Sequence, residues 1–329
     1  MRTKKKLSPL VQLKQRAALS SIGKQRGILR SLSVIWIIVQ WVVEKIGRVG
    51  QKIFFLDQWF LMFDLSLSDS NSIPFHDFQK IIPPKDRFWA DPHVIQVNEH
   101  YFVFVEEYIY RSRKAHISVI EINNEGNYKA PVKVLETGYH LSYPFVFECD
   151  GRYYMVPESS ENKTIELYEC VQFPNKWQRM MNLMENVSAV DTTLFHYGDK
   201  WWLFTGMQED EKSLPLAKLY LFSSSWLFTK EWISHPLNPI EADVTRARPA
   251  GKLFIKEGRI FRPSQKCTRT YGEGFYINEV LRLSESDYSE KTVATVTPYW
   301  DRKILGSHTY VREGQLTLID TFTRRRRIL

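Results

Sequence analysis

The fold is decided by one stretch, Asp86-Arg87-Phe88-Trp89-Ala90-Asp91-Pro92-His93-Val94, together with the aromatic strand YFVFVEE at residues 101–107. An acid stands at the head of an apolar strand, a short polar turn follows, and a second strand ends in another acid. Short runs of β-branched and aromatic residues bounded by turn residues are typical of β-strands. Variants of this two-strand unit recur four more times downstream, so the stretch predicts the architecture of most of the chain.

The repeat becomes visible when the turns between the paired strands are aligned. The second residues of these turns lie 52, 48, 59 and 56 residues apart, at Glu99, Gly151, Asp199, Gly258 and Gly314. An apolar strand follows each turn: YFVFV, YYMVP, WWLFT, IFRPS and LTLID. Self-similarity at about 50 residues indicates stacked four-stranded units, as in propellers of the kelch type. The sequence therefore predicts an all-β fold, a five-bladed β-propeller over residues 56–329.

The fifth repeat offers too few residues for four strands of its own. The apolar run WFLMF at residues 59–63 precedes the first repeat and is a spare strand. Closing the ring with it would also remove the exposed sheet edges of an open array. We therefore expect this run to complete blade five.

Polar residues recur at fixed distances from the turns, where the innermost strands of a propeller face the central channel. Eight residues before the turn lie Asp91, Tyr143 and Asp191 in the first three blades. Blade four is irregular before Gly251, and blade five places the segment around His308 near the channel. Seven residues after the turn, the second strands carry Glu106, Glu158, Gly206, Gln265 and Thr321.

Several carboxylates that share one pocket with aromatic walls suit a sugar, whose hydroxyls bond carboxylates and whose apolar faces stack on rings. Crowded carboxylates also push each other's pKa values apart, as acid/base chemistry requires. The alternative interpretation is structural: the same polar residues would cap turns or join neighbouring blades. The predicted catalytic residues are Asp91, Asp191 and Glu158, and the predicted substrate-binding residues are Trp89, Glu106, His116, Tyr143, Arg246, Arg248, Gln265 and His308.

The net charge of +8 is distributed unevenly. Residues 1–50 contribute +10 and the four arginines at 324–327 contribute +4, which leaves −6 for residues 51–323. The basic ends suit either a solubilising tail or attraction to anionic lipid headgroups, at about 1 kcal/mol per basic residue near the surface. Nucleic acid is not the expected partner, because the aromatic residues sit in strand patterns and do not alternate with the basic runs.

The predicted N-terminal extension, residues 1–55, contains the most apolar run of the chain, LSVIWIIVQWVV at Leu32–Val43. The run is too short for a membrane-spanning helix, which needs about 20 apolar residues. Basic flanks and two tryptophans favour a helix in the membrane interface, with residues 1–52 on an anionic membrane surface; packing on the main domain is the alternative. No small-residue cleavage site follows the basic start, which argues against a secretory signal peptide.

Cysteine usage and ligand spacing bear on compartment and cofactors. Cys149, Cys170 and Cys267 show neither CxxC nor Cys/His spacing. Such a sparse, odd set argues against a disulfide scaffold and suits a reducing compartment. We expect a cytoplasmic protein, peripheral on the inner face of the cytoplasmic membrane. No ligand spacing demands a cofactor, although Asp91 and Asp191 could hold a divalent cation such as Ca²⁺.

An ordered set of motifs resembles one family: DRFWADPHV, YFVFVEE, HISVIE, YHLSYPFVFECDGRYYMVPES, VDTTLFHYGDKWWLF and RARPAG. Over about residues 56–323 the chain is similar to the N-terminal domain of plant glucosamine inositolphosphorylceramide transferases and to bacterial stand-alone proteins like it. The resemblance implies a five-bladed propeller distantly similar to the glycoside-hydrolase clan of arabinanases and levansucrases. It also suggests a setting among surface-polysaccharide genes.

The resemblance to that clan implies roles for three acids. An Asp that opens the first blade is the base or nucleophile, a second Asp tunes a pKa, and a Glu is the acid. Asp91 matches the first position, whereas the second-blade position holds Tyr143 and not an Asp. The clan's triad is therefore not reproduced, and Asp191 and Glu158 would have to rebuild it.

Three functions are compatible with the sequence. The first is sugar transfer during polysaccharide or glycolipid assembly, with a sugar, glycan or sugar nucleotide as ligand and with Arg246 and Arg248 suited to a donor phosphate. No P-loop or Rossmann glycine pattern accompanies it. The second is a glycoside hydrolase that uses Asp91 as base or nucleophile and Glu158 as acid. The third is a non-catalytic glycan-binding propeller.

Overall fold

The computed structural model describes residues 54–66, 75–207 and 217–327. The predicted extension over residues 1–55, including the apolar run Leu32–Val43, lies almost wholly outside these described residues. None of the helices within the described ranges is both long and apolar enough to cross a membrane. The description below concerns the compact unit Asp57–Arg324.

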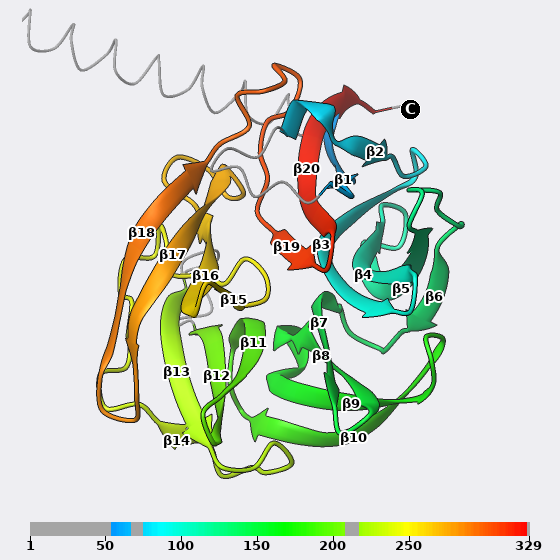
Figure 1. Cartoon of the computed structure of the whole chain (residues 1–329). Helices are drawn as coiled ribbons and strands as arrows, with labels where there is room; N and C mark the ends of the chain where they lie inside the picture. Colours follow the sequence, from blue (N-terminus) through cyan, green and yellow to red (C-terminus); the bar gives the residue numbers. More distant parts are fainter. Residues whose placement is uncertain (1–53, 67–74, 208–216, 328–329) are drawn as a thin grey trace, which may run out of the picture. The chain divides into compact units, whose positions relative to one another are not determined.

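Five antiparallel four-stranded sheets are arranged as blades in a ring, as Figure 1 shows. The predicted five-bladed β-propeller is thus confirmed. Blade one contains β3 (Arg87–Val97), β4 (His100–Ile109), β5 (Lys114–Asn123) and β6 (Val132–Leu135). Blade two contains β7 (Ser142–Cys149), β8 (Arg152–Ser159), β9 (Thr164–Gln172) and β10 (Lys176–Glu185).

The other blades follow the same order, and the five predicted turns each join the first two strands of a blade. Blade three contains β11 (Ala189–Tyr197), β12 (Lys200–Met207), β13 (Lys218–Ser224) and β14 (Ile233–Ser234). Blade four contains β15 (Phe254–Lys256), β16 (Arg259–Lys266), β17 (Gly274–Leu283) and β18 (Tyr288–Val296). Blade five contains β19 (Tyr310–Glu313), β20 (Leu316–Arg326), β1 (Phe55–Asp64) and β2 (Gln79–Ile81).

Blade five is completed by a strand from the other end of the propeller sequence, as the spare run at residues 59–63 predicts. β1 lies between β20 and β2 in that sheet. Its residues Leu61 and Phe63 are fully buried and belong to one apolar cluster with Val94, Val103 and Leu318. Because this cluster joins blade five to blade one, β1 closes the ring by hydrophobic packing as well as by backbone pairing.

The inner strands of the first three blades share an unusual backbone conformation. Asp91, Tyr143 and Asp191 have φ angles of 50°, 41° and 52°, in the left-handed region that non-glycine residues rarely adopt. Strand pairing shifts its register at the same three positions, as in β-bulges. Each bulge turns its residue out of the regular alternation of the strand.

Blade four departs from this pattern at Gly251, where the sequence repeat is also irregular. The φ of Gly251 is 131°, and a Cβ atom there would lie 2.1 Å from the carbonyl oxygen of Tyr310. The neighbouring Ala250 carbonyl accepts a hydrogen bond of 2.8 Å from the Tyr310 N–H. Only glycine permits this close approach of blades four and five.

The role of β1 in closure is tested by Leu61→Ala, which removes a fully buried side chain from the cluster that joins blades five and one. We expect a loss of about 2–5 kcal/mol in the free energy of unfolding, measured by urea denaturation. The matched control is Leu281→Ala, since Leu281 is 51% exposed on β17, and a change within about 0.5 kcal/mol is expected there. Equal effects of the two substitutions would contradict closure through β1.

Candidate functional site

A pocket of about 340 Å³, which we call the channel-mouth pocket, lies near the bulges at Asp91, Tyr143 and Asp191, where the backbone is left-handed. Its polar wall comes from the starts of the inner strands and the ends of the second strands. Six of the eleven predicted site residues line it: Asp91, Glu106, Glu158, Asp191, Arg248 and His308. The remaining lining residues are Trp59, Phe88, Ala90, Tyr108, His140, Ser142 and Tyr271.

Neighbouring blades are joined beneath the pocket by carboxylates that accept backbone hydrogen bonds from the left-handed residues. The Asp91 N–H donates to Oδ2 of Asp320 over 3.0 Å. The Tyr143 N–H donates to Oδ2 of Asp91 over 3.3 Å, and the Asp191 N–H donates to Oε2 of Glu158 over 3.1 Å. These hydrogen bonds therefore both orient the carboxylates and satisfy the buried N–H groups of the bulges.

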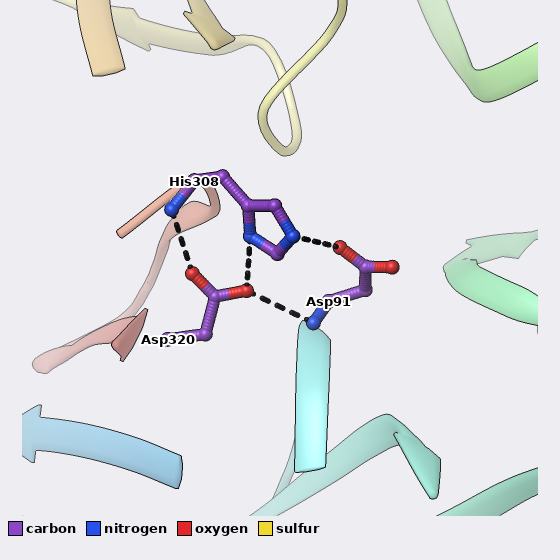
Figure 2. A group of neighbouring side chains, drawn as sticks. All are labelled: Asp91, His308 and Asp320. Carbon is purple, nitrogen blue, oxygen red and sulfur yellow. Dashed lines mark hydrogen bonds and ion pairs between the residues drawn. The ribbon is translucent and has the colours of Figure 1, made fainter. Parts of the chain in front are cut away.

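One cluster of charges consists of Asp91, His308 and Asp320, which Figure 2 shows converging from blades one and five. His308 Nδ1 lies 2.6 Å from Asp320 and Nε2 lies 3.6 Å from Asp91. Burial opposes the charge on His308, but Asp320 and Asp91 raise the pKa of its imidazole to about 9. His308 is therefore a cation at neutral pH, held between two acids.

The two acids of this cluster differ in their electrostatic environment. Burial raises the pKa of Asp91 well above its ordinary value, although His308 opposes that shift. Burial also disfavours the ionised form of Asp320, but His308 and two backbone N–H donors together lower the pKa of Asp320. The surroundings therefore favour the ionised form of Asp320 and disfavour the ionised form of Asp91.

A second cluster contains Glu158, Asp191 and Arg248. Arg248 Nε donates to Oδ2 of Asp191 over 2.6 Å, and its Nη2 lies 3.9 Å from Glu158. Burial and the neighbouring Asp191 raise the pKa of Glu158 to about 7, while Arg248 opposes the rise. Gln265 donates a further bond of 3.1 Å to Asp191. Glu158 is thus a carboxyl that changes charge near neutral pH beside an acid fixed in place.

A third pair of polar groups lies on the blade-one side of the pocket. His140 Nε2 lies 3.1 Å from Oε1 of Glu106. Burial opposes the charge on His140, but the bond to Glu106 raises the pKa of the imidazole above its ordinary value. The pocket therefore presents donors and acceptors from three directions.

Aromatic rings form the rest of the pocket wall. The indole of Trp59 stacks on His308, with ring centroids 4.1 Å apart and an angle of 19°. Phe88 and Tyr108 stack on each other at 4.8 Å, and the Arg248 guanidinium lies 5.2 Å from the centre of the Tyr271 ring. Such rings suit the apolar faces of a sugar.

Five of the predicted site residues do not line the pocket. Tyr143 is fully buried, and its hydroxyl is bonded to Thr193 and to the Gly251 N–H, both over 2.8 Å. Gln265 lies behind Asp191. Trp89 is buried in the apolar cluster that joins blades five and one, so the aromatic role predicted for it falls to other rings.

The other two lie on outer strands or loops. His116 pairs with Glu107 over 3.1 Å, on the third strand of blade one. Arg246 pairs with Glu241 over 3.2 Å and donates to the Thr292 hydroxyl over 2.9 Å. Arg248 alone of the two predicted arginines reaches the pocket.

The residues that the sequence prediction misses include Trp59, His140 and Tyr271 in the pocket wall and Asp320, which is buried behind His308. Asp320 stands six residues after its turn, one position before the expected one, where Thr321 is buried. His140 and Tyr271 come from loops outside the repeated strands. Trp59 lies on β1, more than 200 residues before β19 and β20 of the same blade. A search for acids one residue either side of the repeat position would have found Asp320.

Among the described residues, one group has suitable atoms for a metal ion: Asp91, His308 and Asp320, with ligand atoms within 4.8 Å of one another. Asp191, which the sequence pairs with Asp91 for Ca²⁺, is instead bonded to Arg248. A histidine that binds a metal ion must be neutral, so a metal ion here would have to displace the proton of His308. Without a metal ion, the imidazolium supplies positive charge between the two acids.

Solved structures share the fold of this propeller. A family 32 beta-fructofuranosidase of Bombyx mori matches with a TM-score of 0.53 and 14% identity, over 74% of this chain and 61% of that chain. A family 117 glycoside hydrolase of Zobellia galactanivorans matches with a TM-score of 0.51 and 11% identity, over 82% and 90%. At such identities the likeness shows the fold alone, a five-bladed propeller of the glycoside-hydrolase type.

Sequence comparison identifies the family of this chain. The family model described as "Glucosamine inositolphosphorylceramide transferase 1, N-terminal" matches residues 80–315, and the chain belongs to this family. Glucosamine inositolphosphorylceramide transferase 1 of Oryza sativa subsp. indica is 32% identical over 63% of this chain, and that of Arabidopsis thaliana is 30% identical over 63%. The matches span only 28% and 27% of those relatives' lengths.

The buried imidazolium predicts a pH dependence of stability. The pKa of His308 rises from 6.5 in an unfolded chain to about 9 in the folded protein. Its contribution, about 3 kcal/mol at about 1.4 kcal/mol per pH unit, is complete below pH 6.5 and is lost as the pH rises through 9. Urea denaturation of the wild type and of His308→Gln between pH 6 and 10 measures this difference.

We expect the stability difference between the two proteins to shrink as the pH rises across that window. His76→Gln is the control, since the His76 side chain is 65% exposed, and it should leave the pH profile unchanged. A constant difference between wild type and His308→Gln across the window would show that His308 is not charged in the folded protein.

Proposed function

We propose that this propeller binds a sugar in the channel-mouth pocket and takes part in transferring it to an acceptor during glycolipid or surface polysaccharide assembly. The observation that carries the proposal is Glu158, a largely buried carboxyl whose pKa is raised to about 7 at a pocket lined by further acids and aromatic rings. Membership of the transferase family supports transfer over other sugar chemistry.

Sugar transfer requires a base near the acceptor hydroxyl, whereas the leaving group needs little protonation. Glu158 takes the proton of the acceptor hydroxyl as that oxygen bonds to the anomeric carbon and the bond from this carbon to the donor's phosphate breaks. A phosphate leaves as a stable anion, so no acid is needed on its side. A base with a pKa near the working pH is the most effective one, and Arg248 stabilises the carboxylate form of Glu158 that accepts the proton.

The other pocket residues would hold the sugar. Asp191 is fixed by Arg248 and Gln265 and still faces the pocket, so a free lone pair can accept from a sugar hydroxyl. The pair Glu106–His140 offers an acceptor and a donor. Trp59 and Tyr271 provide apolar surface for the sugar face, which is how carbohydrate pockets combine rings with a few placed polar groups.

A second candidate function is glycoside hydrolysis, which the same raised pKa of Glu158 favours. In that reaction Glu158 would protonate the leaving alkoxide and Asp91 would act as base or nucleophile. The second-blade position does not supply another acid, because Tyr143 is buried with its hydroxyl bonded on both sides. Hydrolysis would therefore have to proceed with Asp191 in the tuning role.

The same proposal places the protein on the inner face of the cytoplasmic membrane. The support is the composition of residues 1–52, which are strongly basic and include an apolar run with two tryptophans. Basic residues beside an apolar segment favour binding to anionic lipid surfaces. Binding to vesicles of phosphatidylglycerol and phosphatidylcholine, compared with phosphatidylcholine alone, measures this directly.

The reaction is tested with Glu158→Gln, which keeps an oxygen for the Asp191 N–H but cannot take a proton. Calorimetry with a panel of sugar nucleotides should show unchanged binding, and transfer of labelled sugar to a membrane extract should fall by about 100-fold or more. The wild-type rate should increase with pH through about 7, since Glu158 acts as a base. Glu257→Gln, at an exposed acid, should keep full activity.

The alternatives give different results in the same assays. Release of reducing sugar at a rate that falls as the pH rises through 7 would identify a hydrolase with Glu158 as acid. Binding of glycans with no turnover would identify a binding domain. Unchanged transfer by Glu158→Gln would remove Glu158 from the reaction.

A further inference from the structure

A second concave surface, which we call the aromatic groove, lies away from the channel-mouth pocket and has a volume of about 490 Å³. It is lined by Glu148, Cys149, Asp150, His196, Trp201, Ser225, Trp226, Leu227 and Phe228. Cys149 ends strand β7, whose first residue, Ser142, lines the channel-mouth pocket. The groove and the pocket therefore lie at opposite ends of the same strand.

The groove exposes an unusual amount of aromatic surface. Trp226 is 77% exposed and Phe228 is 43% exposed. Trp201 is half-buried beside His196, with ring centroids 4.9 Å apart. Exposed rings gathered in a concave surface mark binding sites more often than scattered ones do.

The two acids of the groove, Glu148 and Asp150, have no lysine or arginine partner in the part of the chain that the structure describes. Among the described residues, no lysine or arginine lines the groove, and no basic side chain pairs with Glu148 or Asp150. Both acids are exposed, so their oxygens are available to a ligand. An anionic ligand such as a phosphate or a nucleic acid would meet two like charges here and no counter-charge.

We propose that the aromatic groove is a second carbohydrate-binding site, one that holds a neutral glycan chain. Indole and phenyl rings stack on the apolar faces of sugar rings, and carboxylates accept pairs of hydrogen bonds from sugar hydroxyls. A protein partner that covered the groove with apolar side chains would strip water from two unpaired carboxylates, which is costly. A glycan replaces that water with hydroxyl groups.

This inference goes beyond the proposed function, because it concerns a different surface. A monosaccharide donor needs only the channel-mouth pocket. Two carbohydrate sites at opposite ends of a blade suit a polymeric glycan, bound on one face of the propeller and independently of the chemistry on the other. The ligand class is therefore a polysaccharide or long oligosaccharide.

The test is a glycan array of neutral oligosaccharides, followed by affinity electrophoresis in gels containing the polymers that correspond to the bound glycans. The wild type should bind at least one neutral glycan. Trp226→Ala should weaken that binding by about tenfold or more, since stacking on an exposed ring is lost. Glu148→Gln should also weaken glycan binding. Asp150→Asn should do the same, and asparagine can adopt the left-handed backbone found at Asp150.

The control is Tyr299→Ala, at an aromatic residue that is 79% exposed elsewhere, and it should leave glycan binding unchanged. Glu158→Gln should also bind the polymer normally, so failure of the groove and failure of the proposed reaction are distinguishable. The proposal is overturned if no neutral glycan binds, or if Trp226→Ala binds as the wild type does. It is also overturned if light scattering shows a dimer that Trp226→Ala dissociates, since the groove would then be a protein interface.

Discussion

The structure depends on carboxylates that accept backbone hydrogen bonds across the boundary between neighbouring blades. Asp320 receives the Asp91 N–H, Asp91 receives the Tyr143 N–H, and Glu158 receives the Asp191 N–H. Each donor residue has a left-handed backbone, which costs free energy unless the surroundings fix it. These hydrogen bonds hold the left-handed backbone in place. The same interactions therefore join neighbouring blades and orient the acids of the site.

This constraint also explains why so many charges are buried together. Carboxylates that serve as joints cannot be replaced by apolar residues without leaving N–H groups unpaired. Their mutual repulsion is relieved by one cation in each cluster, His308 between Asp91 and Asp320 and Arg248 beside Asp191 and Glu158. Burial, with a smaller contribution from neighbouring acids, raises the pKa values of Asp91 and Glu158. The raised pKa values of these two carboxyls are therefore a consequence of how the ring is held together.

The fold is that of glycoside hydrolases, but the fold alone does not decide the reaction. Where the hydrolase clan is expected to have a second acid, this chain has Tyr143, whose hydroxyl joins Thr193 to the Gly251 backbone. In the proposed transfer, this structural hydroxyl leaves Glu158 as the group that takes the proton, with Asp191 fixed beside it. The leaving phosphate of that proposed reaction needs no acid.

The sequence by itself determined the number of blades, the five turns, the closing strand and the register of Asp91, Asp191, Glu106 and Glu158, because these follow from a repeat in the chain. Only the tertiary structure brought in Trp59, which ring closure carries to the site, and His140 and Tyr271, which lie on loops outside the repeat. The tertiary structure also placed the side chains of Trp89 and Asp91 in different environments. Strand alternation would put both on one face, but the bulge turns Asp91 into the pocket beside Ala90 and leaves Trp89 in the core.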